Sequence, residues 1–109
     1  MRVISRRRLR EFWDENPESE TALKAWYLVA KKAKWASLAD VRGTYPHADL
    51  VRIRCSKTHV KTVVVFNIAG NNVRLITDIV YPTQCIYIKF VLTHPEYDRE
   101  AWKGQICRE

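Results

Sequence analysis

The residues best suited to chemistry lie in the second half of the chain. We expect His94 in a loop after a segment rich in β-forming residues, and histidine is the side chain most often used for proton transfer near neutral pH, which makes it a candidate for that role. Asp98, four residues later, either orients His94 or caps a helix in the tail. Arg74 carries a guanidinium that stays charged and can bind two phosphate oxygens as a fork. The alternatives are an ordinary surface histidine and a solvent-facing arginine after a turn.

Two further candidates flank His94 in the sequence. Lys89 alternates with Ile88 and Phe90, so we expect it to point to the sheet face opposite to theirs. It either adds a second positive charge at a reacting phosphate or keeps the outer face of the sheet hydrated. Tyr97 either stacks on a nucleic-acid base, donates its phenol hydrogen, or packs its ring against the sheet.

The charge of the chain indicates a polyanionic partner. Its formal net charge is +7 and its isoelectric point is about 9.6. Nucleic acids, ribosomes and anionic proteins are the large polyanions of a cell, although a merely solvated cationic face is the alternative. We expect two basic stretches to contact RNA phosphates by charge alone. The first holds the N-terminal arginines Arg2, Arg6, Arg7, Arg8 and Arg10, and the second holds Arg52, Arg54, Lys57 and Lys61.

The cysteines and histidines predict neither a disulfide framework nor a metal site. The three cysteines are odd in number and far apart, so we expect thiols. They are Cys55, Cys85 and Cys107. No pair has C-x-x-C spacing, and the three histidines lack ligand spacing. We therefore expect no metal and no cofactor. The chain has no apolar run of roughly 20 residues and no signal peptide at its start, which predicts a cytoplasmic protein without a membrane partner.

The order of the elements predicts an α+β fold in a single domain spanning residues 1–109. A short strand comes first, then a helix with Ser5 as its N-cap, a helix that starts at Pro17 and a short helix with Ser37 as its N-cap. We assign the turn A-G-N-N at residues 69–72, with Asn67, to the connection between strands. At least three antiparallel strands follow the helices, which pack on one face of the sheet. These strands span residues 60–68, 73–81 and 85–92.

Two long segments carry a family resemblance. Residues 65–76 read V-F-N-I-A-G-N-N-V-R-L-I, which closely resembles the V-F-N-I-x-G-N-x-x-R-L-I signature of HigB-type toxins. Residues 87–98 read Y-I-K-F-V-L-T-H-P-E-Y-D and resemble the segment I-[RK]-F-V-x-T-H-x-E-Y-D of the same family. Residues 1–5 and 9–13 resemble its usual opening. Pro95 stands where alanine or lysine is usual, and residues 52–61 are longer and more basic than the pattern.

The resemblance implies a RelE-like fold and the toxin of a type II toxin-antitoxin system. Such a toxin is a metal-independent endoribonuclease that cleaves messenger RNA on translating ribosomes and is neutralised by a helix-turn-helix antitoxin. RNA cleavage needs a base, a cation and an acid. The candidates carried by the matching segments are His94, Arg74, Lys89 and Tyr97.

Two other functions remain open at this point. Some RelE-like toxins, of the ParE type, poison gyrase, and the T-H-x-E-Y-D match disfavours this alternative. A non-catalytic ribosome-binding or RNA-binding module would keep the basic surface but would need neither His94 nor Tyr97.

Overall fold

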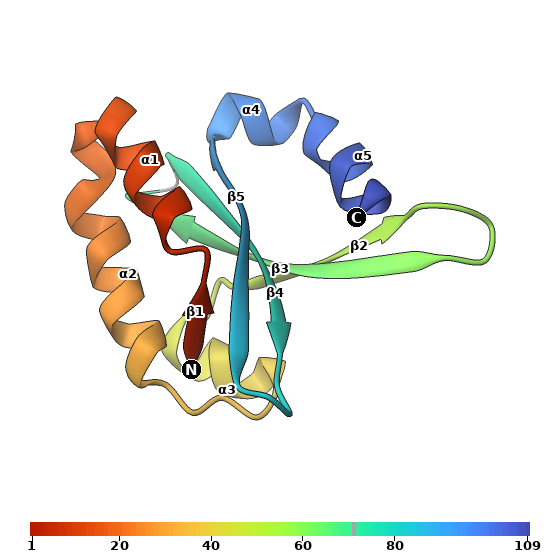
Figure 1. The fold of residues 1–109 in the computed structure, drawn as a ribbon, viewed down its shortest axis with the longest axis horizontal. Helices are drawn as coiled ribbons and strands as arrows, with labels where there is room; N and C mark the ends of the chain where they lie inside the picture. The colour runs from red at the N-terminus through yellow and green to blue at the C-terminus, as the bar shows by residue number, and fades with distance from the viewer. Residues whose placement is uncertain (71) are drawn as a thin grey trace.

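A five-stranded sheet forms the centre of the computed structural model, which describes every residue except Asn71. The strand order is β1-β5-β4-β3-β2 (Figure 1). β1 pairs with β5 in parallel, and all other neighbours are antiparallel. The strands are β1 (Arg2–Ile4), β2 (Asp49–Arg54), β3 (Val60–Ile68), β4 (Val73–Val80) and β5 (Cys85–Thr93).

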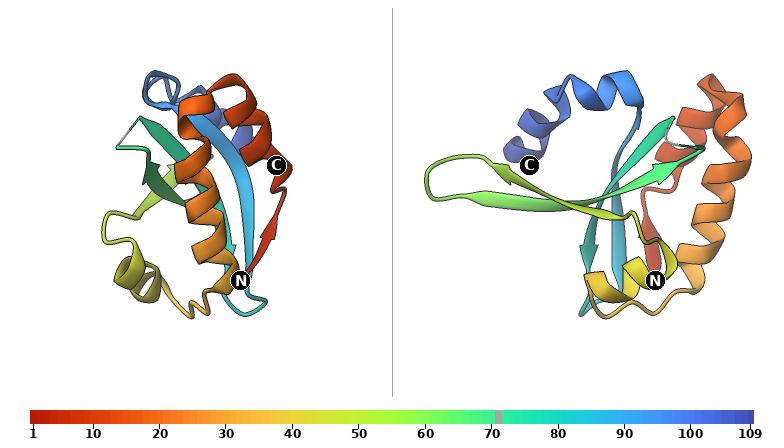
Figure 2. Two further views of the ribbon diagram at one scale, coloured as in Figure 1. Left: turned by 90° about the vertical axis from the view of Figure 1, so that its left-hand side faces the viewer. Right: turned by 180° about the vertical axis from the view of Figure 1, so that it is seen from behind.

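Helices cover both faces of this sheet. α1 and α2 lie on one side, and α4 and α5 lie on the other, beside the β2–β3 hairpin (Figures 1 and 2). The helices are α1 (Arg7–Glu15), α2 (Glu20–Lys32), α3 (Leu38–Thr44), α4 (His94–Asp98) and α5 (Ala101–Arg108), with a short 3-10 helix, η1 (Pro17–Ser19), before α2. The predicted α+β class, with N-terminal helices on one face, is confirmed. The tail forms two further helices, α4 and α5, which cover the second face.

The first face holds the larger core. Leu9 of α1 and Leu23 and Trp26 of α2 are almost fully buried. The indole of Trp26 meets the ring of Phe66 edge-on, with ring centres 5.4 Å apart, a favoured aromatic geometry. The predicted helical stripe therefore packs against the sheet, as its spacing indicated.

The second face holds a smaller core built by the tail. Trp102 and Ile106 of α5 are buried against Ile53, Val65 and Ile76 of the sheet. Burial of a large side chain stabilises a fold by roughly 1.5 to 3 kcal/mol. This contact therefore fixes α5 on the sheet.

A β-bulge changes the direction of Lys89. Ile76 pairs with Phe90 while the next residue, Thr77, pairs with Ile88, so Lys89 is the extra residue between them. Ile88 consequently packs in the first core and Phe90 in the second. The prediction that Ile88 and Phe90 share a face is wrong, because strict alternation fails at a bulge.

Two predicted caps have different outcomes. Ser5 has φ of 69° and does not cap α1, which begins after Arg6 without a side-chain cap. Ser37 does cap α3, since its side chain accepts a hydrogen bond from the amide of Asp40 at 3.4 Å. The predicted turn between β3 and β4 is present, with Gly70 at φ of 63°, a backbone conformation that glycine adopts readily. Asn71 of this turn lies outside the described residues.

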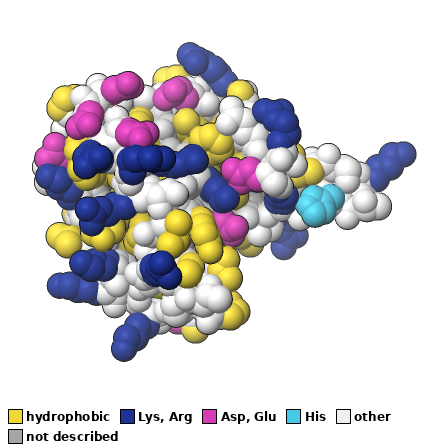
Figure 3. Space-filling view, in the orientation of Figure 1, with side chains coloured by type: hydrophobic (Ala, Val, Ile, Leu, Met, Phe, Trp, Pro, Cys, Tyr) yellow, Lys and Arg dark blue, Asp and Glu magenta, His cyan; other side chains and the backbone are white. Residues whose placement is uncertain are grey.

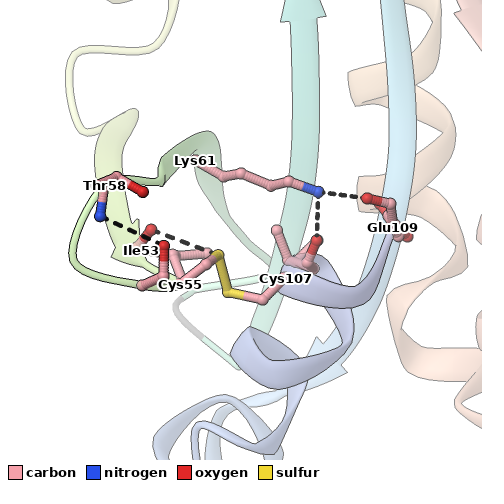
Figure 4. Close-up of a disulfide and its surroundings, with 8 residues drawn as sticks. Ile53, Cys55, Thr58, Lys61, Cys107 and Glu109 are labelled. Atoms are coloured by element: carbon pink, nitrogen blue, oxygen red, sulfur yellow. Dashed lines mark hydrogen bonds between the residues drawn. A yellow bond between two sulfur atoms is a disulfide. The ribbon is translucent and has the colours of Figure 1, made fainter.

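The prediction of three thiols is wrong. Cys55 at the end of β2 forms a disulfide with Cys107 in α5, with Cα atoms 5.4 Å apart (Figure 4). The odd number and wide spacing of the cysteines did not indicate this bond. The two residues are 52 positions apart and meet only because the tail folds back onto the β2–β3 hairpin. Cys85 is free and buried. Among the described residues no helix is long and apolar enough to span a membrane.

Candidate active site

A hollow of about 530 Å³ opens on the second face of the sheet, between the end of α3, strands β2 to β4 and α4. We call it the Arg74 hollow. Val65 and Tyr97, which line it, also contact the second core, and this places the hollow on the face opposite to α1 and α2. The polar side chains around it are those of Arg42, His47, Asp49, Asn67, Arg74 and Tyr97.

β4 and β3 together position Arg74. It is the second residue of β4 and pairs with Asn67 of β3, so both side chains point to the same face. The Cζ atom of Arg74 lies 5.7 Å from the centre of the Tyr97 ring, within range of a cation–π contact. The hollow thus holds a permanent positive charge whose orientation is restrained by an aromatic ring.

Tyr97 is held from its other side by α5. Its ring stacks on that of Trp102, with ring centres 5.3 Å apart. The Trp102 Nε1 donates a hydrogen bond to the Tyr97 carbonyl at 3.0 Å. Burial raises the pKa of the Tyr97 phenol above its usual value and nearby Asp49 adds to this, although Lys103 and Arg74 oppose it. The hydroxyl therefore stays protonated at neutral pH and can donate a hydrogen bond or a proton.

His94 is the first residue of α4, not part of a loop as predicted. Thr93 and Glu96 form a capping box that starts this helix, and the His94 amide donates to the Asn72 carbonyl at 3.1 Å. The imidazole Nδ1 lies 2.8 Å from the Asp98 carboxylate. Of the two predicted roles of Asp98, the geometry supports the orientation of His94 and not a helix cap. With Nδ1 engaged, Nε2 is the nitrogen left for a substrate.

The structure brings three of the four predicted catalytic residues to one region. Arg74 and Tyr97 line the same hollow. His94 lies three residues before Tyr97, about one turn away on the same side of α4, with 48% of its side chain exposed. The fourth, Lys89, lines a separate hollow with Lys61.

Contacts with the tail occupy Lys89. Its Nζ lies 2.9 Å from a carboxylate oxygen of Glu109, and its carbonyl accepts a hydrogen bond from Arg8. These contacts keep the ammonium of Lys89 away from the Arg74 hollow. They therefore disfavour its predicted role as a second positive charge at the reacting phosphate.

The second predicted basic stretch divides into two parts. Arg52, Arg54 and Lys57 are exposed on the β2–β3 hairpin, whose far end projects beyond the rest of the sheet (Figures 1 and 2). Basic side chains are visible at the projecting end in the space-filling view (Figure 3). Lys61 differs, because its Nζ donates to the carbonyls of Ile106 at 2.9 Å and Glu109 at 2.7 Å (Figure 4). A cation at the C-terminus of a helix stabilises it, so Lys61 helps to hold α5.

Sequence reasoning missed part of the hollow. Asn67 was assigned to the turn but lies within β3 and lines the hollow. Arg42 and His47 come from the end of α3 and the segment after it, where the Arg42 Nε donates to the Ala48 carbonyl at 3.0 Å. Their sequence offered no strand or helix pattern that points to the site. Only the α3–β2 connection brings them there.

Comparison with known proteins decides the family. Residues 19–100 match the model of the HigB toxin family, described as the RelE-like toxic component of a toxin-antitoxin system. The chain belongs to the HigB toxin family. This confirms the resemblance read from residues 65–76 and 87–98. α5, with Cys107, lies beyond the matched segment.

Relatives of this HigB-family toxin cover nearly its whole length. It is 27% identical to the "mRNA interferase HigB" of Escherichia coli O6:H1 strain CFT073, over 91% of this chain and 90% of the relative. It is 26% identical to the "mRNA interferase toxin HigB" of Escherichia coli K12, and likewise to the "mRNA interferase HigB" of Shigella flexneri, in each case over 90% of this chain and 88% of the relative.

Proposed function

We propose that this HigB-family toxin is an endoribonuclease that cleaves messenger RNA on the ribosome without a metal ion. The observation that supports this most directly is the pairing of Arg74 and Tyr97 in one hollow, with His94 one helical turn away. The names of its relatives support the same reaction.

In the proposed reaction the ribose 2′-oxygen attacks the neighbouring phosphorus and the 5′-oxygen leaves. The His94 Nε2 takes the proton from the 2′-hydroxyl, since an imidazole is partly unprotonated at neutral pH. The Arg74 guanidinium binds the phosphate oxygens and stabilises the charge that develops on them. The Tyr97 hydroxyl donates its proton to the leaving 5′-oxygen.

Metal independence follows from these assignments, because side chains supply the base, the cation and the acid. Lys89 contributes to the local positive potential at most, since it lines another hollow and pairs with Glu109. In this scheme Asp98 is a positioning residue that holds the imidazole of His94.

The proposal includes the ribosome and an antitoxin as partners. The exposed cations of the projecting hairpin, Arg52, Arg54 and Lys57, are suited to ribosomal or messenger phosphates. Neutralisation by a helix-turn-helix antitoxin, and action in the cytoplasm, where messenger RNA and ribosomes are located, rest on the family relationship.

Expression of the chain without its partner tests the proposal. We expect growth arrest together with loss of intact transcripts, and new 5′ ends detected by primer extension. In vitro, purified toxin that has been treated with EDTA and then freed of it should cleave messenger RNA on translating ribosomes as fast as untreated toxin, with free messenger RNA as the comparison. Full-length transcripts during a real growth arrest would contradict the nuclease proposal, and DNA damage in the same cells would indicate a gyrase poison.

A further inference from the structure

A second concave surface lies between α1 and α2, away from the Arg74 hollow. This α1–α2 groove has a volume of about 400 Å³, and none of its lining residues lines the Arg74 hollow. Its apolar part is formed by Leu9, Trp13, Tyr27 and Leu28. Since α1 and α2 pack on the opposite face of the sheet from Tyr97, the groove plays no part in the proposed reaction.

Cations hold the aromatic side chains of the groove. The Lys24 Nζ lies 5.3 Å from the centre of the Trp13 ring, and the Arg6 Cζ lies 5.0 Å from that of Tyr27. Arg6 also donates a hydrogen bond to the Tyr27 hydroxyl at 3.1 Å. Each ring is thus held beside a positive charge, which gives a preformed apolar surface with a basic border.

Apolar side chains remain exposed at this border. Leu28, which lines the groove, is 55% exposed, and Val29, the next residue of α2, is 41% exposed but does not line the groove. In the space-filling view, basic and hydrophobic side chains lie close together over α1 and α2 (Figure 3). Neighbouring exposed aliphatic groups with a polar border are typical of a protein-binding surface.

Charge decides the kind of partner. Arg10 borders the groove and belongs to none of the salt bridges formed among the described residues. A segment that carries carboxylates beside apolar side chains would pair with Arg10 and cover Leu28, whereas Lys24 already pairs with Glu20 at 2.7 Å. RNA fits less well, because exposed aliphatic groups such as Leu28 do not bind phosphates.

We propose that the α1–α2 groove binds an acidic, amphipathic segment of the antitoxin. The inference rests on the proposed function in one respect, that the chain has an antitoxin partner. It goes beyond that function by assigning the contact to a surface separate from the Arg74 hollow. Antitoxin binding and RNA cleavage should therefore be separable by mutation.

The double variant Arg10→Glu/Leu28→Glu tests this separation. Both side chains are exposed, so the variant should fold, which circular dichroism and thermal unfolding can verify. The matched control is Lys32→Glu, a charge reversal at an exposed position of α2 that does not line the groove. Each toxin is expressed with the helix-turn-helix protein encoded by the adjacent reading frame, and binding of the purified pair is measured at several salt concentrations.

We expect the antitoxin to rescue cells that express the parent or Lys32→Glu, but not cells that express the double variant. Its affinity for the double variant should fall by at least about tenfold, as for loss of a central interface contact. Two single variants distinguish the contributions: Arg10→Gln should reduce the salt dependence, and Leu28→Lys should weaken binding while adding positive charge.

Rescue and affinity equal to those of the parent would overturn the inference. A folded double variant that binds antitoxin normally but no longer cleaves messenger RNA would overturn it too, and would assign the groove to RNA. If the parent itself fails to cleave messenger RNA, the proposed reaction is wrong, while the binding measurement still decides the role of the groove.

Discussion

The indole of Trp102 stacks on the phenol ring of Tyr97, with the two ring planes 17° apart. Trp102 belongs to α5, which is joined through Cys107 to the end of β2. The position of Tyr97 in the Arg74 hollow therefore depends on a helix that lies outside the segment matched by the family model. The tail contributes to the geometry of the candidate active site as well as to the fold.

Replacement of Tyr97 separates its hydroxyl from its ring. Tyr97→Phe keeps the stack on Trp102 and the contact with Arg74, so the free energy of unfolding should change by less than about 1 kcal/mol. If the hydroxyl donates a proton, single-turnover cleavage should fall by roughly 100-fold. Tyr97→Ala should lose more activity and also stability. Cleavage by Tyr97→Phe at the parent rate would show that the ring acts by stacking.

His94→Ala should affect the reaction much more than folding. The side chain is 48% exposed and its contact with Asp98 is largely solvated, so the stability cost should stay within about 1 kcal/mol. Cleavage should fall by about two orders of magnitude or more. Lys89→Ala is the control and should lose less activity. Normal cleavage by a folded His94→Ala would mean that another group is the base, and His47, which lines the hollow, would be the next candidate.

Arg74 offers a test of geometry at constant charge. Arg74→Lys keeps the positive charge but loses the planar fork and its fit to two phosphate oxygens. We expect Arg74→Ala to lose cleavage by about 100-fold or more and Arg74→Lys to lose an intermediate amount. Single-turnover rates on ribosome-bound messenger RNA measure both. Full activity of Arg74→Ala with unchanged unfolding would mean that another cation serves the phosphate.

Local pattern predicted the elements of this fold better than their contacts. Apolar spacing predicted the packing of Trp26, and the turn sequence predicted the connection from β3 to β4. The bulge at Lys89 was not predictable, because an extra residue leaves no trace in a run of β-forming side chains. The disulfide and the place of His47 depend on long-range folding of the tail and of the α3–β2 connection, which spacing along the chain does not encode.

The projecting hairpin should contribute electrostatic affinity for the ribosome. Arg54→Glu/Lys57→Glu should weaken binding and flatten the dependence of log affinity on log salt, because each lost phosphate contact lowers the slope. Lys61→Met should instead destabilise the tail, since its ammonium binds the carbonyls of Ile106 and Glu109. The affinity for ribosomes, measured at salt concentrations between about 50 and 200 mM, checks the predicted change in slope. An unchanged slope would leave these cations without a role in binding.

In the oxidised protein, purified without reductant, the disulfide between Cys55 and Cys107 should be a large contributor to stability. It joins residues 52 positions apart, and the chain-entropy model gives about 4 kcal/mol for a loop of that size. Urea unfolding with and without a thiol reductant should show a loss of this order. The variant Cys55→Ser/Cys107→Ser should resemble the reduced protein and ignore the reductant. Thiol titration of the denatured protein should find only Cys85 before reduction and all three cysteines after it. Three reactive thiols without reduction, with an unfolding midpoint that the reductant does not change, would mean that the bond does not form.

Reduction of the disulfide should also lower the cleavage rate, because α5 holds Trp102 against Tyr97. Single-turnover cleavage with and without reductant measures this effect. A cleavage rate that does not change with reductant would show that burial of Trp102 and Ile106 is sufficient to hold the tail.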